Sequence, residues 1–321
     1  MKLKHTLTAM LAIATGAAAN LDAGQVDANL PDYKKTFGVS GTLNAVGSDT
    51  LNNMMALWAE AFQAIYPNVK VQIEGKGSST APPALIEGTA QLGPMSRAMK
   101  DSEIDKFEKK FGYKPTQISV AIDALAVFAN KDNPITGLNL KQVDSIFSST
   151  YKRGAKPAKT WGDLGATGDW ASKPISLYGR NSASGTYGFF KKVALLGGDY
   201  STSVKEQPGS SAVVQGVSSD LGGLGYSGIG YKTSGVKALK LAGEEGGQFE
   251  PTAENCISGD YPLARTLYIY CNKAPNKKLD KLTREFLRFT LSKQGQEIVA
   301  KDGYYPLPAQ IAEQIRASIG K

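Results

Sequence analysis

Apolar strands that pass through a glycine- or serine-rich turn directly into a helix are the feature that most restricts this fold. Residues 41–50 are typical of a strand that ends in the polar turn GSDT, and residues 51–65 carry one apolar stripe at helical spacing. Residues 68–74 then alternate apolar and polar side chains, and residues 75–80 (GKGSST) lead into another helix. Because strands alternate with helices, the sequence predicts an α/β fold.

The stretch RNSASGTYGFF at residues 180–190 repeats this design and adds a cation. Arg180 precedes Ser184, Gly185 and Thr186, and an apolar helical run follows. A helix start offers unpaired N–H donors and about half an elementary positive charge, and a guanidinium can bind two oxygens at once. We therefore predict a site for a small anion. The alternative is that Ser184 or Thr186 only caps the helix and that Arg180 is a surface ion-pair partner.

The N-terminus has the order of a secretory signal peptide. Lysines precede an apolar run at residues 7–14, and the small residues GAAA at 16–19 predict cleavage after Ala19. The run is too short and too rich in alanine and threonine to span a bilayer, and no cysteine stands at the cleavage site to carry a lipid. We expect an exported protein, periplasmic or alternatively secreted, in which residues 20–37 form a flexible lead.

Composition argues against several functions. The formal charge of +8 falls to +6 without residues 1–19, which suits a nucleic acid, an anionic surface or a small anion. No basic run is interleaved with aromatic residues, so we expect no binding of nucleic acid. The single histidine is His5, so the mature chain has no Ser-His-Asp or Cys-His catalytic arrangement and no histidine zinc site. We expect no cofactor and no metal.

The two cysteines, Cys256 and Cys271, are too few for a thiolate metal site. In an oxidising compartment we expect them to form a disulfide that closes a short loop and stabilises the protein by roughly 3 kcal/mol. Two separately buried thiols are the alternative.

Four motifs, in this order, resemble the periplasmic phosphate-binding proteins of ABC transporters, the PstS family. They are VGSDTL at residues 46–51, GSST at 77–80, LGPMSR at 92–97 and RNSASGT at 180–186. The resemblance extends from about residue 43 to residue 308. It includes ALAVF at 124–128, LGY at 224–226 and RTLYIY at 265–270. Each motif alone is a weak signal, whereas four in order behind a signal peptide are a strong one.

The resemblance implies a two-lobed binding protein of the cluster II type, with the ligand cleft between lobes joined by two crossing strands. It places residues 38–122 and 268–321 in lobe 1 and residues 123–267 in lobe 2. A mature chain of this length also favours two lobes, because single cores stop growing near roughly 250–300 residues. Asp123 stands inside an apolar strand that passes between the lobes, which makes it a candidate hinge or cleft residue.

The resemblance also implies the contacts to phosphate. The first turn contributes hydroxyl and backbone donors, the glycine-serine turn a further hydroxyl, and the start of the later helix an arginine with its hydroxyl neighbours. The phosphate-binding residues expected on this basis, with the end of the third motif included, are Thr50, Leu51, Ser78, Ser79, Ser96, Arg97, Arg180, Ser184, Gly185 and Thr186.

Two positions depart from the best-known form of the family pattern. Ser96, followed by Arg97, stands where a carboxylate is usual, and Ser182 stands in place of the acid beside the arginine, so the partner of Arg180 stays open. At neutral pH phosphate carries a proton and sulfate does not, so a buried carboxylate can select phosphate. We nominate Asp49 for this role. Its alternative is to cap its own helix.

We expect a monomeric, non-enzymatic protein that binds inorganic phosphate in the periplasm and delivers it to an ABC-type permease in the inner membrane. One alternative is a binding protein for another tetrahedral oxyanion, sulfate or molybdate. A secreted phosphatase or hydrolase with Ser48 or Ser184 as nucleophile is another, which the lack of histidine disfavours. A third is an adhesion protein in which the anion site is vestigial.

Overall fold

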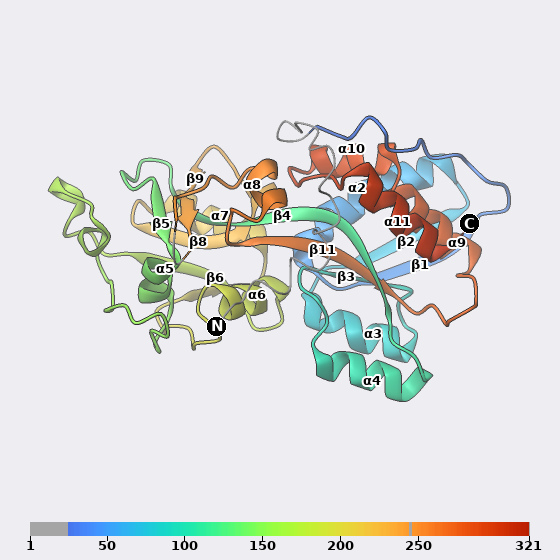
Figure 1. Ribbon diagram of the computed structural model, residues 1–321, viewed down its shortest axis with the longest axis horizontal. Helices are drawn as coiled ribbons and strands as arrows, with labels where there is room; N and C mark the ends of the chain where they lie inside the picture. Colours follow the sequence, from blue (N-terminus) through green and yellow to red (C-terminus); the bar gives the residue numbers. More distant parts are fainter. Residues whose placement is uncertain (1–24, 244–245, 321) are drawn as a thin grey trace.

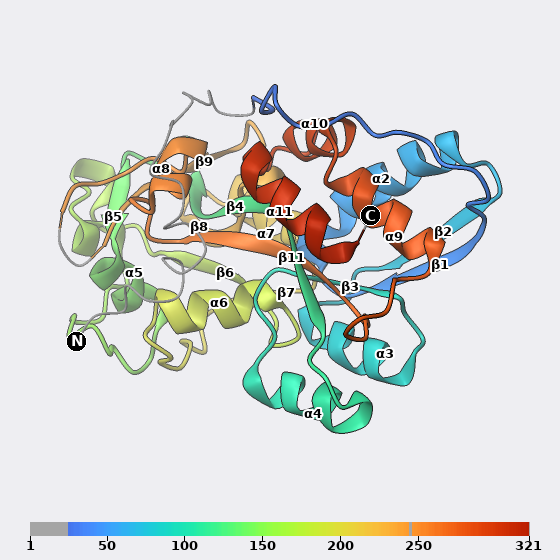
Figure 2. The same ribbon diagram turned by 45° about the vertical axis from the view of Figure 1, so that its right-hand side comes forward.

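Two lobes lie side by side in the computed structural model, which describes residues 25–243 and 246–320 (Figure 1). The predicted signal peptide, residues 1–19, lies outside the described residues. Figures 1 and 2 show two long strands, β4 and β11, running from one lobe into the other. The α/β, two-lobed architecture with two crossing strands is therefore confirmed. We keep the predicted boundaries as a working division into lobe 1 and lobe 2.

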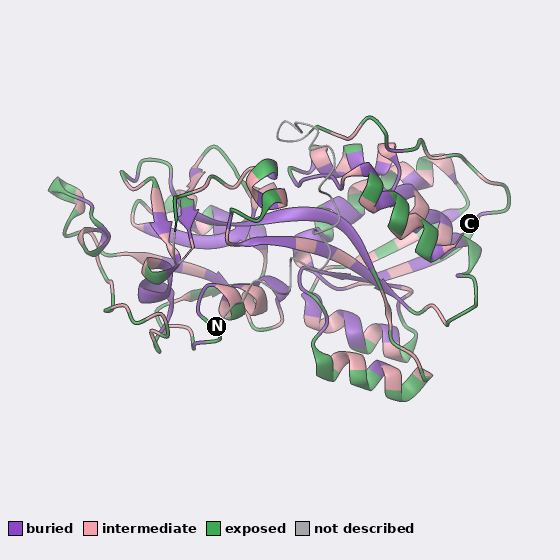
Figure 3. Ribbon diagram, in the orientation of Figure 1, coloured by how far each residue is buried: buried purple, intermediate pink, exposed green. Residues whose placement is uncertain are grey.

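The crossing strand β4 (Thr116–Asn130) changes its partner partway along its length. As far as Ala124 it pairs antiparallel with β11 (Ala264–Cys271), and from Leu125 it pairs with β8. Nearly every residue of β4 is buried, and so are most residues of β11 (Figure 3). A continuous apolar strand of this kind needs cover on both faces, which the two lobes supply.

Lobe 1 is a mixed sheet with helices on both faces. The strand order is β2-β1-β3-β11-β4, with β1 parallel to β2 and β3. Its elements are β1 (Gly41–Val46), the 3-10 turn η1 (Asp49–Leu51), α2 (Asn52–Ile65), β2 (Val69–Glu74), η2 (Ser78–Thr80), α3 (Ala81–Glu87), β3 (Leu92–Met95), α4 (Asp101–Phe111), α9 (Lys281–Thr290), α10 (Lys293–Lys301) and α11 (Ala309–Ile319). Helices α3 and α4 cover one face and the other four helices cover the opposite face (Figure 1).

Lobe 2 continues the sheet from the second half of β4 in the order β4-β8-β6-β7, with β9 also paired to β4. Its strands are β5 (Gly137–Asn139), β6 (Ser176–Arg180), β7 (Lys205–Gln207), β8 (Gly223–Gly228), β9 (Val236–Ala238) and β10 (Lys240–Ala242). Its helices and 3-10 turns are α5 (Leu140–Phe147), η3 (Trp161–Leu164), η4 (Gly168–Trp170), α6 (Gly185–Val193), α7 (Ser210–Ser219), η5 (Ile229–Tyr231) and α8 (Ala253–Ser258). None of the helices within the described ranges is long and apolar enough to cross a membrane.

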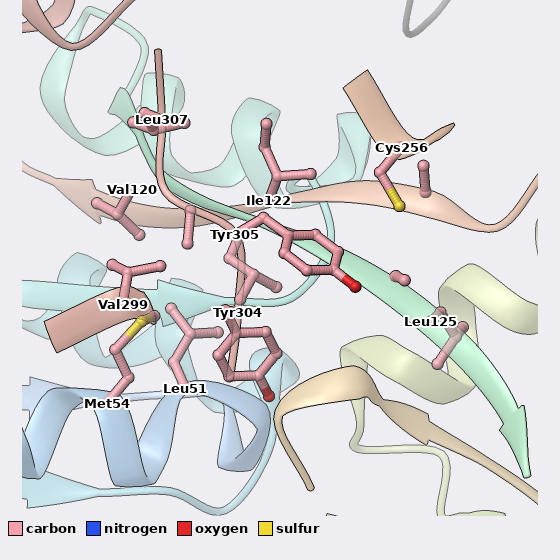
Figure 4. Close-up of a cluster of buried hydrophobic side chains, with 14 of the residues drawn as sticks. Leu51, Met54, Val120, Ile122, Leu125, Cys256, Val299, Tyr304, Tyr305 and Leu307 are labelled. Carbon is pink, nitrogen blue, oxygen red and sulfur yellow. The ribbon is translucent and has the colours of Figure 1, made fainter. Parts of the chain in front are cut away.

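A buried apolar cluster lies against the crossing strands (Figure 4). It draws side chains from α2, β4, α8, α10 and the segment after α10, including Met54, Leu125 and Val299. Tyr305 in that segment exchanges two backbone hydrogen bonds with Ile122 of β4, both at 2.9 Å. The contact fixes the chain that follows α10 against the junction of the lobes, beside the turn that ends β1.

The segment expected to be a flexible lead is, over residues 25–37, packed against lobe 1. Tyr33 donates its backbone N–H to Gln294 Oε1 at 2.8 Å, and its ring packs edge-on against Phe289. Lys293 donates its backbone N–H to the carbonyl of Pro31. The expectation of flexibility is wrong for this part of the chain, because single anchoring side chains at irregular spacing leave no periodic pattern.

The predicted disulfide is also wrong: Cys256 and Cys271 are buried free thiols. Cys256 lies in α8, whereas Cys271 ends β11 opposite Leu92 and Thr116 in lobe 1. The chain between them includes all of β11, and eight extended residues span more than 20 Å at about 3.3 Å each. Compartment and loop length carry no information about this straight strand, which keeps the two thiols apart. Burial raises the pKa of Cys271 to about 12.

Candidate anion-binding site

Three helix starts converge where the lobes meet. The turn η1 follows β1, η2 and α3 follow β2, and α6 follows β6 of lobe 2. Because β1 and β2 are parallel, their carboxyl ends meet at one edge of the sheet. Gly77 donates its N–H to the carbonyl of Gly47 at 2.7 Å, and Ser48 donates to the carbonyl of Pro94 at 2.8 Å. These bonds tie the two turns to β3 as one rim.

A cluster of four hydroxyls lies at this rim, and we call Thr50, Ser78, Ser96 and Thr186 the hydroxyl cluster. All four residues are fully buried. Thr50 Oγ1 lies 2.9 Å from Thr186 Oγ1, and Ser78 Oγ lies 3.2 Å from Ser96 Oγ. Ser96 Oγ and Thr186 Oγ1 are 3.5 Å apart. Three members come from lobe 1 and one from lobe 2, so the lobes meet through hydroxyl groups that can each donate or accept.

The lobes also approach so closely that two glycines are required. A Cβ atom on Gly185 would lie 2.3 Å from Ser78 Oγ and 2.7 Å from Ser96 Oγ. A Cβ atom on Gly77 would lie 2.6 Å from the carbonyl oxygen of Ala183, and Gly77 has a φ of +125°. Beside it, the N–H of Ser79 donates to that same carbonyl at 3.1 Å. Ser79 therefore contacts lobe 2 through its backbone.

Ser184 caps α6. Its Oγ accepts hydrogen bonds from the N–H groups of Thr186 and Tyr187, at 3.1 and 3.4 Å. The cap alternative thus describes the Ser184 side chain, whereas the Thr186 side chain joins the hydroxyl cluster. The cap satisfies two N–H donors in the first turn of α6.

Arg180, at the end of β6, is buried with 1% of its surface exposed. Its Nη1 donates to Ser210 Oγ at 2.6 Å and lies 3.1 Å from Asp49 Oδ2, and its Nη2 donates to the carbonyl of Pro208 at 3.2 Å. Among the described residues, its Nε has no hydrogen-bond partner. Burial lowers the pKa of Arg180, and the neighbouring Asp49 opposes that shift. The surface ion-pair interpretation of Arg180 is therefore wrong.

Asp49 is the partner of Arg180 that the sequence left open. Its Oδ2 also accepts the N–H and the Oγ–H of Ser210, both at 2.8 Å. The N-cap position of its own turn is Ser48, and no side chain makes a cap hydrogen bond there. The alternative in which Asp49 caps its own helix is therefore wrong, since its carboxylate faces lobe 2.

Arg265 is a site residue that sequence reasoning missed. It pairs with Asp123 across β11 and β4, with Nε and Nη2 at 2.8 and 2.7 Å from Asp123 Oδ2. Its Nη1 donates to Thr186 Oγ1 at 2.9 Å and to the carbonyl of Ser96 at 3.0 Å. The available signal was that each of these two mostly apolar strands carries a single charged residue, and that the two charges are opposite. Asp123 thus lies beside the hydroxyl cluster, on the strand that crosses between the lobes.

The side chains of Arg97 and Leu51, both predicted to bind phosphate, make their contacts elsewhere in lobe 1. Arg97 makes a two-pronged ion pair with Glu103 at 2.7 Å and reaches Ser79 Oγ at 3.3 Å. Burial raises the pKa of Glu103, but hydrogen bonds from Arg97 and from the backbone of Lys100 outweigh it and lower that pKa overall. The Leu51 side chain belongs to the apolar cluster of Figure 4.

Two tyrosines, Tyr226 and Tyr200, form a chain of hydrogen bonds, here called the aromatic relay, that connects Arg180 to α6. The N–H of Arg180 donates to Tyr226 Oη at 3.2 Å, Tyr226 donates to Tyr200 Oη at 3.0 Å, and Tyr200 donates to the carbonyl of Tyr187 at 2.9 Å. The ring of Phe190 stacks on Tyr226 with centroids 4.0 Å apart. The relay joins the backbone at the end of β6 to the first turn of α6, so both sets of donors are held in one geometry.

The assembled site suits a small anion. Two guanidinium groups and two carboxylates cancel in formal charge, which leaves hydroxyls, helix starts and the unpaired Arg180 Nε as the net donors. Across residues 25–243 and 246–320, no group of histidine, cysteine, aspartate and glutamate could hold a metal ion. The fold and the site together define a two-lobed solute-binding protein with a candidate anion site between its lobes.

Comparison with known proteins specifies the class further. A family model described as a PBP superfamily domain matches residues 35–294. The chain is 58% identical over 322 residues to the phosphate-binding protein PstS of Pseudomonas aeruginosa, with 100% of both chains covered. It is 28% identical to protein SphX of Synechococcus elongatus, over 92% of this chain and 86% of that protein. The chain belongs to the PstS family of the PBP superfamily.

A solved structure gives the same result for the fold. The putative phosphate ABC transporter substrate-binding protein of Clostridium perfringens, solved with bound phosphate, is similar with a TM-score of 0.71 and 26% identity. The similarity covers 83% of this chain and 100% of that chain.

Proposed function

We propose that this protein binds inorganic phosphate between its lobes and delivers it to an ABC-type permease in the inner membrane. The observation that carries the proposal is the buried hydroxyl cluster, built from both lobes, in which Arg265 donates to Thr186 and beside which Arg180 pairs with Asp49, the neighbour of Thr50. The PstS protein of Pseudomonas aeruginosa, named for phosphate binding, shares 58% of its residues with this chain over its full length. The chain is therefore a binding protein rather than an enzyme.

Binding proceeds through exchange of hydrogen bonds. In the closed arrangement the hydroxyls of Thr50 and Thr186 contact each other across the cleft, as do those of Ser96 and Thr186. When the lobes separate, phosphate oxygens take the place of these contacts and closure buries the anion. Each hydrogen bond to a charged group contributes about 1.5–3 kcal/mol. Oriented hydroxyls and helix starts then stabilise most of the charge of the phosphate.

The compartment follows from the predicted signal peptide, which we propose directs the protein to the periplasm as a monomer. The hydrolase alternative finds no support in the candidate nucleophiles. Ser184 Oγ is held as the cap of α6, and Ser48 is buried. Sulfate and molybdate remain the rival ligands within the same class.

Calorimetric titration of the mature protein, after unfolding and refolding to strip carried-over ligand, tests the proposal. We expect phosphate to bind one-to-one and sulfate to give no heat. If sulfate or molybdate bound and phosphate did not, that anion would be assigned as the ligand. If none of the three anions bound, the proposed function would be rejected.

Gly185→Ala is expected to weaken phosphate binding by about 1–3 kcal/mol, since the new methyl group would meet Ser78 Oγ at 2.3 Å and oppose closure. Gly188→Ala in the same helix is the matched control, because its Cβ would meet only the Arg97 side chain, no closer than 3.6 Å. Titration of both variants checks this. Equal affinities would mean that the lobes do not close as described.

Asp49→Asn is expected to reduce the preference for phosphate over sulfate by about tenfold, corresponding to one lost hydrogen bond to a charged group. Oδ1 of Asp49 accepts none of the bonds from Ser210 or Arg180, so we propose that it accepts the phosphate proton. Loss of the contacts at Oδ2 weakens both anions alike, so the ratio of the two dissociation constants isolates the proton. An unchanged ratio would reject this role.

A further inference from the structure

We infer that Asp49 of lobe 1 and Ser210 of lobe 2 form a latch. The Asp49 carboxylate binds the start of α7 when the lobes are closed, and these bonds slow release of the ligand. The two residues are 161 positions apart in the chain and meet only because the lobes are together. The inference rests on the proposed function for the identity of the ligand, but the contacts themselves do not depend on it.

The start of α7 lacks a cap from its own lobe. Gly209 occupies the N-cap position and has no side chain to accept from the first N–H groups. Asp49 supplies the missing acceptor, since its Oδ2 takes both the N–H and the Oγ–H of Ser210 at 2.8 Å. A carboxylate is favoured at this end of a helix by the exposed N–H donors and the helix dipole.

Arg180 makes the latch cooperative. Its Nη1 contacts Ser210 Oγ and lies 3.1 Å from the same Asp49 oxygen, while its Nη2 bonds Pro208. Arg180, Ser210 and Pro208 all belong to lobe 2 and stay together when the lobes part. Asp49 moves away with lobe 1, so opening breaks the three contacts that its Oδ2 makes with Ser210 and Arg180.

A second contact holds the same residue of lobe 1. Tyr231, in the turn η5 after β8, donates its hydroxyl to the backbone carbonyl of Asp49 at 2.9 Å. Asp49 is thus held by lobe 2 through both its side chain and its backbone. Since these bonds must break before the ligand leaves but are not needed for it to enter open lobes, the latch acts on the dissociation rate.

Ser210→Ala tests the latch, because it removes the hydroxyl that joins Asp49 to Arg180 and retains the backbone N–H. Stopped-flow measurements should show dissociation of phosphate roughly tenfold faster, with the association rate within about twofold of the wild type. Ser211→Ala, on the next and exposed residue of α7, should match the wild type in both rates. Tyr231→Phe should also speed dissociation, which gives a second variant if Ser210→Ala folds poorly.

The double variant Asp49→Asn with Ser210→Ala separates the latch from general damage. If the two residues act together, the double variant should dissociate no faster than the faster single variant. Additive effects would overturn the latch, as would wild-type dissociation rates in folded Ser210→Ala and Tyr231→Phe.

X-ray scattering without added anion tests the latch independently of whether the protein binds phosphate. The latch predicts a larger radius of gyration for Ser210→Ala than for the wild type, because more molecules are open. If the wild type failed to bind phosphate, the function would be rejected while this comparison still decided the latch, and equal radii would then overturn it.

Discussion

Arg265→Met is expected to destabilise the protein by about 3–5 kcal/mol, because it leaves the Asp123 carboxylate buried without its counter-charge. Asp123 has no exposed surface and Arg265 only 2%. The substitution keeps an unbranched side chain of similar length, so the loss of packing is small. Thermal unfolding should begin roughly 10 °C lower, given 2–4 °C for each kcal/mol in proteins of this size.

The double variant Arg265→Met with Asp123→Asn provides the control. Removing both charges leaves no unpaired carboxylate in the interior, so much of the lost stability should return. The amide oxygen introduced by Asp123→Asn can still accept the N–H of Ile229, as Asp123 Oδ1 does. A single variant that unfolds within 2 °C of the wild type would show that Asp123 reaches water or another cation.

Arg180→Ala should lower phosphate affinity by at least about 3 kcal/mol, or roughly a hundredfold. The guanidinium is buried, carries the unpaired Nε donor and lies next to the start of α7, so its removal takes a desolvated charge from the cleft. Arg180→Lys should recover only part of the affinity, since an ammonium group cannot reproduce the planar fork.

Calorimetric titration of the folded variants measures this effect. Lys192→Ala removes an equal charge from the exposed surface of α6 and should bind phosphate with nearly the wild-type affinity. If Arg180→Ala bound phosphate as tightly as Lys192→Ala, the anion would lie elsewhere in the protein.

Periodic elements of the fold could be predicted because burial leaves a repeating pattern. Strand β2 and helix α2 appear within a residue of their predicted bounds. Helix α6 differs at its end, since the apolar run continues to Leu196 whereas the helix ends at Val193. Its start depends on the Ser184 cap, and Leu196 and Gly197 beyond its end adopt left-handed backbone with φ of 49° and 73°. Such local geometry leaves no apolar period.

Some residues of the candidate site could likewise be predicted from the sequence, and others could not. The resemblance pointed to Thr50, Ser78 and Thr186, which the structure brings into one cluster, and their contact with phosphate stays a prediction. Arg265 and Ser210 were missed because their neighbours come from distant parts of the chain. The pairing of Asp49 with Arg180 arises in the same way, since only the closed lobes bring these residues together.

Lobe 1 is assembled from both ends of the chain, and this has a consequence for the order of folding. Strand β11 lies between β3 and β4 in the sheet, and Phe62 of α2 packs against Phe286 and Phe289 of α9. Every strand of lobe 2 precedes β11 in the chain, so lobe 2 can have all its strands before lobe 1 has this interior one. The apolar stripe of α2 therefore stays exposed until the last helices pack against it, so a chain that ends before α9 cannot complete the core of lobe 1.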